Sequence, residues 1–137
     1  MHPDPRGTLY IVATPIGNLA DMSPRAVDLL DGVEIIACED MRHSQKLLDH
    51  YHIKTPTMTY HDHSDRQNAE KIFDRLERGD SVALISDAGT PLISDPGYRL
   101  VAEARKRGLD VIPIPGSCAL VSAHSVSGLA TDRFSFI

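Results

Sequence analysis

Five short runs of apolar residues alternate along the chain with segments whose apolar residues recur at helical spacing. Most of the runs are continuously apolar. This is typical of strands that are covered on both faces, and such strands belong to parallel sheets. The expected strands span residues 8–14, 32–39, 55–61, 81–86 and 109–115. The regular alternation of strand and helix predicts an α/β fold, a three-layer domain with a mostly parallel five-stranded sheet.

Start and stop signals mark the helices between these strands. Ser23 followed by Pro24 predicts the start of the first helix, because a serine can cap a helix and a proline fits its first turn. By the same reasoning, Asp95 should cap a helix that starts at Pro96 and ends at Gly108. Other helices are expected over residues 42–51, 64–79 and 117–128.

Length, cysteine content and charge limit the class of protein. The 137 residues suit one domain, and no apolar run approaches the roughly 20 residues of a membrane helix. The start of the chain has no apolar signal region, and Cys38 and Cys118 match no metal motif. We therefore expect a cytoplasmic protein with reduced thiols and no membrane partner. The formal net charge of −5 argues against a broad basic surface for nucleic acid, but it leaves a local basic patch open.

The two ends of the chain bear on its domain organisation. Residues 1–7 are expected to form a disordered tail ahead of an α/β domain over residues 8–137. The chain stops in an aromatic run, "DRFSFI", whereas natural domain ends are more often polar. We therefore expect that this chain is part of a longer protein.

The loops that follow the strands form the expected site, since ligands of open parallel sheets bind beyond the carboxyl ends of the strands. The loop after the first strand lacks the glycine fingerprint of dinucleotide-binding folds, and the sequence contains no P-loop. The loop over 86–97, "SDAGTPLISDPG", holds Asp87 and Asp95 but no Lys or Arg. It therefore suits a neutral or partly cationic ligand better than a phosphate. Gly89 should allow the backbone to approach a flat ligand closely.

Two further loops carry titratable side chains. The stretch "CEDMRHS" places four of them at the end of the second strand: Glu39, Asp40, Arg42 and His43. A charged cluster at this position is a candidate for substrate binding or acid–base chemistry. The stretch "HDHSD" holds His61 and His63, but no spacing fixes the third ligand that a catalytic metal needs. A hydrogen-bonding role is therefore favoured for these two histidines, and no metal site is predicted.

Six segments in order form a pattern that is more specific than any one loop. They are "LYIVATPIGNLADMSPRA" (9–26), "ACEDMRHSQKLL" (37–48), "HDHS" (61–64), "ALISDAGTPLISDPGYRLV" (83–101), "PIPGSCAL" (113–120) and "SGLATDRFSF" (127–136). Together they resemble the tetrapyrrole-methylase superfamily of S-adenosylmethionine-dependent methyltransferases. More closely, they resemble its branch that acts on ribosomal RNA, the ribosomal RNA small subunit methyltransferase I family. The superfamily's tetrapyrrole enzymes have a glycine-rich first loop and a Gly-Asp-Pro in the fourth, where this chain has "TPIGN" and "GTP". Both departures fit the ribosomal branch.

The resemblance implies two α/β domains with S-adenosylmethionine in the cleft between them, in an enzyme that is commonly a homodimer. It also implies that this chain is the N-terminal domain alone and that the C-terminal domain is absent. The implied reaction is 2′-O-methylation of a cytidine ribose in 16S ribosomal RNA, within the small ribosomal subunit. The family's cofactor loops carry over onto Pro15, Ile16, Gly17, Asp87, Thr90, Ile93, Ser117 and Cys118. The family commonly has a threonine at the position of Met41. Removal of a proton from the ribose hydroxyl needs a base, and the candidates are Glu39, Asp40, His61 and His63.

Two other functions remain open from the sequence. One keeps the methyl transfer but changes the substrate to a tetrapyrrole or another small molecule. The other is a ligand-binding or dimerisation module without catalysis of its own. Basic residues over 66–78 or over 99–107 are candidates for a local RNA-binding patch in a chain of negative net charge.

Overall fold

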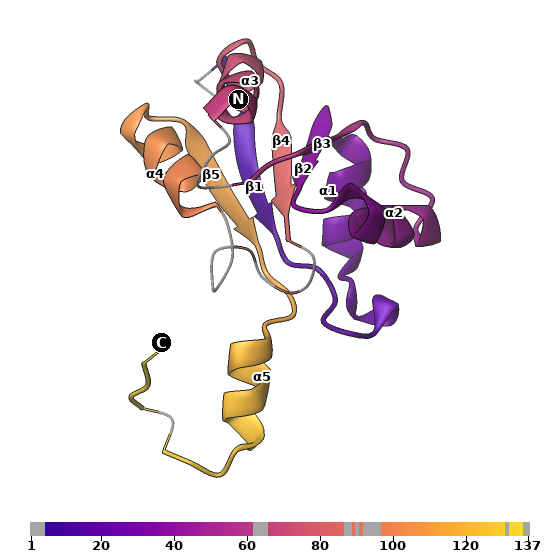
Figure 1. Cartoon of the computed structure of the whole chain (residues 1–137), viewed down its shortest axis with the longest axis vertical. Coiled ribbons are helices and arrows are strands. Elements are labelled where there is room, and N and C mark those ends of the chain that lie inside the picture. Colours follow the sequence, from indigo (N-terminus) through magenta and orange to yellow (C-terminus); the bar gives the residue numbers. More distant parts are fainter. Residues whose placement is uncertain are drawn as a thin grey trace.

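The computed structural model describes residues 5–61, 66–86, 89, 91, 97–130 and 132–135. Within these residues, the strands form one five-stranded sheet in the order β3-β2-β4-β1-β5, and every neighbouring pair is parallel (Figure 1). The strands are β1 (Thr8–Val12), β2 (Ile35–Cys38), β3 (Thr57–Thr59), β4 (Val82–Ile85) and β5 (Asp110–Ile114). Each strand lies inside its predicted range, and the parallel sheet confirms the predicted α/β class.

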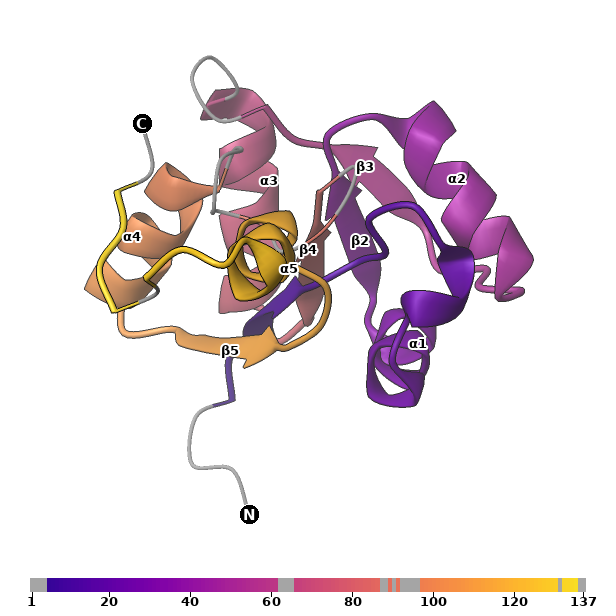
Figure 2. The ribbon, with the colours of Figure 1, turned by 90° about the horizontal axis from the view of Figure 1, so that it is seen from below.

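Helices cover both faces of this sheet. They are α1 (Pro24–Gly32), α2 (Met41–His50), α3 (Arg66–Glu77) and α4 (Tyr98–Lys106). A further helix, α5 (Ala119–Val126), and a 3-10 turn, η1 (Leu19–Asp21), belong to neither face. Alternate side chains of β4 explain the layering: Val82 and Leu84 pack with α3 and α4, whereas Ala83 and Ile85 pack with α1 and α2. Figure 2 shows the two pairs of helices on opposite sides of the sheet. The predicted three layers are therefore present.

The starts of two helices follow the capping rules. Ser23 Oγ accepts a hydrogen bond from the Ala26 amide at 3.1 Å, and Pro24 occupies the first turn of α1, as predicted. The α2 helix begins in the same way, because Asp40 Oδ1 accepts the Arg42 amide at 2.9 Å. These caps satisfy amide groups that have no partner inside the helix.

The starts of α4 and α5 differ from the prediction. The α4 helix begins at Tyr98 rather than at Pro96, and Gly97 is its N-cap, with φ of 127° and no side-chain hydrogen bond. A glycine in the left-handed region interrupts helical geometry, so the helix starts after it. Asp95 and Pro96 themselves lie outside the described residues. The α5 helix begins at Ala119, two residues later than expected, because Cys118 is extended and forms its N-cap.

The N-terminal segment joins the fold earlier than expected. Gly7 is buried and donates a hydrogen bond from its amide to the Leu76 carbonyl at 2.7 Å. Arg6 donates from its guanidinium to the Arg107 carbonyl at 3.0 Å. The expected tail over 1–7 is therefore too long at its C-terminal end, since residues 6 and 7 pack against the ends of α3 and α4. Residues 1–4 lie outside the described part of the chain.

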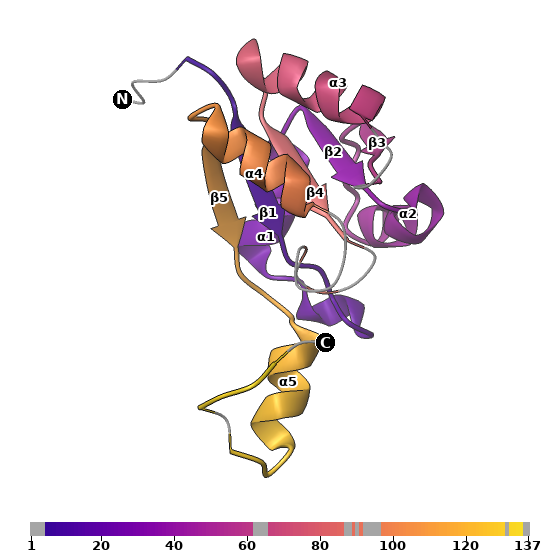
Figure 3. The same ribbon diagram turned by 60° about the vertical axis from the view of Figure 1, so that its left-hand side comes forward.

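The α5 helix lies apart from the three layers, beyond the carboxyl ends of the strands (Figures 1 and 3). None of its residues is buried. Large apolar side chains in and after it are exposed: Val121, Val126, Leu129 and Phe134. In the parts of the chain that are described, no helix is both long enough and apolar enough to span a bilayer.

Candidate ligand-binding site

The loops after β1 and β4 are joined directly at the carboxyl edge of the sheet. Thr14 and Gly89 exchange two backbone hydrogen bonds, at 2.8 and 2.9 Å. Hydroxyl groups reinforce this bridge, since Thr14 Oγ1 donates to the Ser86 and Gly89 carbonyls and Ser86 Oγ donates to the Gly89 carbonyl. Thr14 and Ser86 are 2% and 5% exposed, so these bonds are shielded from water. The bridge holds the two loops in a fixed relation.

The loop after β5 packs against the two loops that this bridge joins. The Ala13 amide donates to the Ile114 carbonyl at 3.2 Å. A Cβ atom on Gly116 would lie 2.9 Å from the Ala13 Cβ, and one on Gly89 would lie 3.1 Å from Ile16 Cγ2 and 3.6 Å from the Ser117 carbonyl oxygen. Gly89 also has φ of 80°. In the structure, Gly89 allows the protein's own three loops to approach one another, and its expected role in the approach of a ligand stays a prediction.

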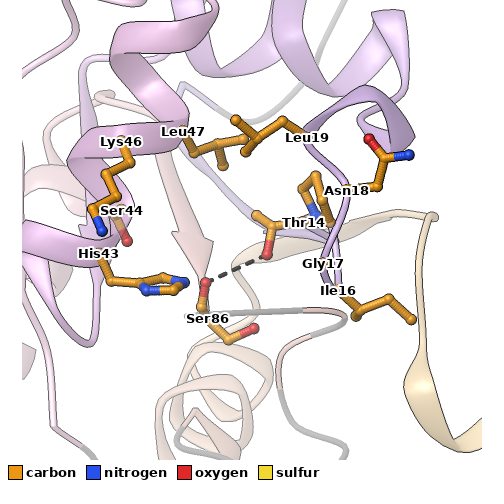
Figure 4. A pocket seen from close by; sticks show the side chains of 11 residues that line it. Thr14, Ile16, Gly17, Asn18, Leu19, His43, Ser44, Lys46, Leu47 and Ser86 are labelled. Carbon is orange, nitrogen blue, oxygen red and sulfur yellow. Dashed lines mark hydrogen bonds between the residues drawn. The ribbon is translucent and has the colours of Figure 1, made fainter.

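A pocket of about 420 Å³ opens between the loop after β1 and helix α2 (Figure 4). Its walls come from three elements and are formed by Thr14, Pro15, Ile16, Gly17, Asn18, Leu19, His43, Ser44, Lys46, Leu47 and Ser86. Three of the predicted cofactor-binding residues, Pro15, Ile16 and Gly17, line this pocket. None of the described residues that line it carries a carboxylate. We call this cavity the α2 pocket.

A second, more open pocket of about 570 Å³ lies at the ends of β2 and β3. The register of these strands pairs Cys38 with Thr59, so the residues that follow them meet at the same edge. The pocket is lined by Glu39, Asp40, Met41, Arg42, Thr59 and His61. It brings together four of the five predicted catalytic residues, and the fifth, His63, lies outside the described residues. We call this cavity the charged pocket.

The first turn of α2 separates the two pockets. Its residues Met41 and Arg42 line the charged pocket, whereas His43 and Ser44 line the α2 pocket. The separation follows from the helix, because successive residues are turned by about 100° around its axis. A ligand that filled both pockets would therefore contact both sides of this turn.

Several predicted site residues are not in either pocket. The Ser117 carbonyl lies near Gly89, and Cys118 caps α5, but neither residue lines the two pockets. Asp87, Thr90 and Ile93 lie outside the described residues. Within the described chain, no three His, Cys, Asp or Glu side chains are grouped so that they could hold a metal ion.

Sequence reasoning did not predict most of the α2 pocket. The missed lining residues are Thr14, Asn18, Leu19, Ser44, Lys46, Leu47 and Ser86, whereas His43 is part of the charged cluster predicted at the end of the second strand. The spacing of His43, Ser44 and Leu47 on one face of α2 is a signal that the sequence contains. What it does not contain is the packing that turns this face toward the loop after β1.

Comparisons with known proteins identify the fold and the family. The family model of the tetrapyrrole (corrin/porphyrin) methylases matches residues 8–136. Among solved structures, uroporphyrin-III-C-methyltransferase from Thermus thermophilus superposes with a TM-score of 0.67 at 19% identity, covering 93% of this chain and 55% of that one. The cobalamin biosynthetic enzyme cobalt precorrin-4 methyltransferase gives 0.69 at 17% identity, covering 88% of this chain and 50% of that one. At such identities the likeness concerns the fold alone.

Curated relatives are much more similar in sequence. The ribosomal RNA small subunit methyltransferase I of Vibrio cholerae is 56% identical over 128 residues, which are 93% of this chain and 44% of that protein. The protein of the same name from Pasteurella multocida is 55% identical over 130 residues, which are 95% and 46% of the two chains. The chain thus spans about half the length of the curated relatives it matches. With the family model matched over residues 8–136, the chain belongs to the tetrapyrrole (corrin/porphyrin) methylases.

Proposed function

We propose that this chain is part of an S-adenosylmethionine-dependent methyltransferase that methylates the 2′-hydroxyl of a cytidine ribose in 16S ribosomal RNA. One observation carries the proposal: relatives that are 50–56% identical over nearly the whole chain are named ribosomal RNA small subunit methyltransferase I. The tetrapyrrole enzymes resemble the chain in fold, but at 17–19% identity. The sequence similarity therefore favours the ribosomal substrate.

The α2 pocket fits part of such a cofactor. Its volume lies in the usual range for small-molecule sites, and its walls combine apolar side chains with a few hydroxyl groups. Pro15, Ile16 and Gly17 would hold the cofactor on this side, and the adjoining loops would contribute Asp87, Thr90, Ile93, Ser117 and Cys118. When bound, S-adenosylmethionine supplies an activated methyl group on a sulfonium centre.

The charged pocket supplies the groups that the acceptor needs. A ribose hydroxyl loses its proton during methylation, and Glu39, Asp40 and His61 are the described side chains there that can accept one. Arg42 is exposed at the same opening and offers a guanidinium to a phosphate of the RNA backbone. The protein's main contribution is to hold the hydroxyl in line with the methyl group, since positioning provides much of the rate.

A basic surface on α3 supports an RNA partner. Lys71 and Arg75 of α3 and Arg78 just after it line a groove of about 320 Å³, which also contains Asp74. Asp80 lies 3.5 Å from Arg75 and 3.0 Å from Arg78, so part of this positive charge is neutralised within the protein. The groove also contains Asn68, whose amide donates to the Thr59 carbonyl and so connects α3 with the strand that borders the charged pocket.

The domain organisation is proposed on two grounds. The relatives are about twice as long as this chain, and the exposed apolar side chains in and after α5 are of the kind that a further domain or a second subunit covers. Residues 8–137 would then form the N-terminal domain of a cytoplasmic homodimer.

The test uses the gene product that carries this sequence, tritiated S-adenosylmethionine and small ribosomal subunits from a strain that lacks this methylation. Label is expected in 16S RNA, at a cytidine whose 3′ phosphodiester resists alkaline hydrolysis because the 2′-oxygen is blocked. Uroporphyrinogen III offered in a parallel reaction tests the tetrapyrrole alternative. Label in the tetrapyrrole, or binding of the cofactor without transfer to RNA, would contradict the proposal.

A further inference from the structure

The starting observation is a buried hydroxyl group without a partner. Ser44 is 3% exposed, and its Oγ is the one fully buried side-chain oxygen or nitrogen in the described residues that lacks a hydrogen bond. Buried polar groups in proteins are nearly always paired, because an unpaired one loses its bonds to water without replacement. The Ser44 amide is paired with the Asp40 carbonyl at 3.0 Å in the normal helical way. The side-chain oxygen therefore has no role in capping or holding the helix.

The surroundings of Ser44 indicate what could pair with it. The residue lines the α2 pocket beside His43, and Figure 4 shows the His43 ring extending from α2 toward Ser86. Across the cavity lie the apolar side chains of Ile16 and Leu19. A rotation about the single χ1 bond of a serine moves its oxygen between staggered positions, and one such step can turn it toward a ligand in the cavity. The α2 pocket thus combines flat apolar walls with polar groups on one side.

We propose that the α2 pocket binds a nucleoside, and that His43 and Ser44 provide its polar contacts. Among the described residues that line the pocket there is no carboxylate, and the one cationic side chain, Lys46, is exposed, so this part of the cavity suits a neutral group. A nucleoside is neutral: its base is flat, and its ribose carries hydroxyl groups. Ser44 Oγ would exchange a hydrogen bond with one of those groups, and the imidazole of His43 would contact the base.

The inference rests on the proposed function, because that reaction involves two nucleosides. One is the adenosine of the cofactor, and the other is the target nucleoside of the RNA. Both present the same chemistry to the pocket, and the position of the pocket next to the first turn of α2 is compatible with either. The two sources are separated by measuring the binding of each alone.

The experiment compares the gene product with its Ser44→Ala, His43→Ala and Gln45→Ala variants. Gln45 is the matched control, since it follows Ser44 on α2, is exposed and bonds only to Asp49 among the contacts described. Calorimetric titration with S-adenosylhomocysteine and with a short cytidine-containing oligonucleotide gives the two affinities. Ser44→Ala should weaken one of them about tenfold, the usual effect of one lost hydrogen bond to a ligand, and Gln45→Ala should change neither. His43→Ala should lower the affinity for the same ligand.

A second measurement separates binding from folding. The melting temperature of ligand-free Ser44→Ala should equal or exceed that of the wild type, because no hydrogen bond is lost. Weaker binding accompanied by a lower melting temperature would overturn the proposal, as would unchanged affinity for both ligands in Ser44→Ala and His43→Ala. Calorimetric titration does not require turnover. Loss of nucleoside affinity in these variants would therefore support nucleoside binding in the α2 pocket even if ribosomal RNA were not methylated. Conversely, RNA methylation with unchanged affinities in the variants would support the proposed function and refute nucleoside binding by His43 and Ser44.

Discussion

Replacing Gly116 with alanine tests whether the three strand-end loops are packed as tightly as the structure shows. The new Cβ would lie 2.9 Å from the Ala13 Cβ, which is shorter than a normal carbon–carbon contact. Ala13 is 4% exposed and its Cβ is fixed to the backbone, so the clash is relieved only if the loops after β1 and β5 move apart. Overpacking of this kind costs about 2 kcal/mol of unfolding free energy.

The sequence offers a matched control for this substitution. Gly32 is exposed at the end of α1, and a Cβ there would meet no atom within 4 Å. Gly32→Ala should therefore stabilise the protein by about 0.5–1 kcal/mol, through the lower backbone entropy of alanine in the unfolded chain. The two Gly→Ala changes are thus expected to have opposite signs, and urea denaturation followed by circular dichroism measures both.

A compensating change makes the prediction sharper. Ala13→Gly removes the methyl group that Gly116→Ala would meet, so the double variant should be more stable than the sum of the single effects predicts. A coupling free energy of at least about 1 kcal/mol is expected for residues in direct contact. The separated loops should also weaken binding of S-adenosylhomocysteine, because Ser117 and Cys118 follow Gly116. A Gly116→Ala protein as stable as the wild type, or an additive double variant, would refute the packing of the three loops.

Three further substitutions test other parts of the fold and site. Gly7→Ala would place a Cβ 1.7 Å from the Asp80 carbonyl oxygen, and it should cost about 3 kcal/mol in urea denaturation, whereas an unchanged midpoint would exclude this contact. Asp40→Ala removes the cap on the Arg42 amide and should cost about 1 kcal/mol, while Asp40→Ser should keep the cap. If the Asp40 carboxylate acts on the substrate, both variants lose methyl transfer, and an active Asp40→Ser enzyme would rule that role out. Thr14→Val removes two weak hydrogen bonds and should cost about 1 kcal/mol and speed hydrogen exchange at the Gly89 amide, and unchanged exchange would show that the hydroxyl does not support the bridge.

Most of the secondary structure was determined by local sequence patterns. β-rich runs predicted all five strands, and most of these runs are continuously apolar, because a strand that is covered on both faces carries apolar side chains on both. The pair Ser23-Pro24 predicted the start of α1, since a capping side chain acts on amides within its own turn. Where the local signal was wrong, as at α4, a neighbouring glycine with positive φ decided the start instead.

Several of the loops that the sequence predicted as the site line the two pockets, though only the tertiary structure decided how these loops meet. Glu39 and His61 are far apart in the chain, but the pairing of β2 with β3 brings them to one pocket. The strand order cannot be read from apolar runs, because such a run indicates that a strand is buried but not which strand lies beside it.

Ser44 shows most clearly what the sequence alone could not predict. On the sequence it is an ordinary helical serine, and nothing local distinguishes it from the other serines of the chain. Its burial, its lack of a hydrogen-bond partner and its place in the α2 pocket all result from the packing of α2 beside the loop after β1. The sequence by itself determined the elements and the family, because these depend on short-range patterns and on ordered motifs. The tertiary structure alone decided the two pockets, because a pocket is a relation between segments that are distant in the chain.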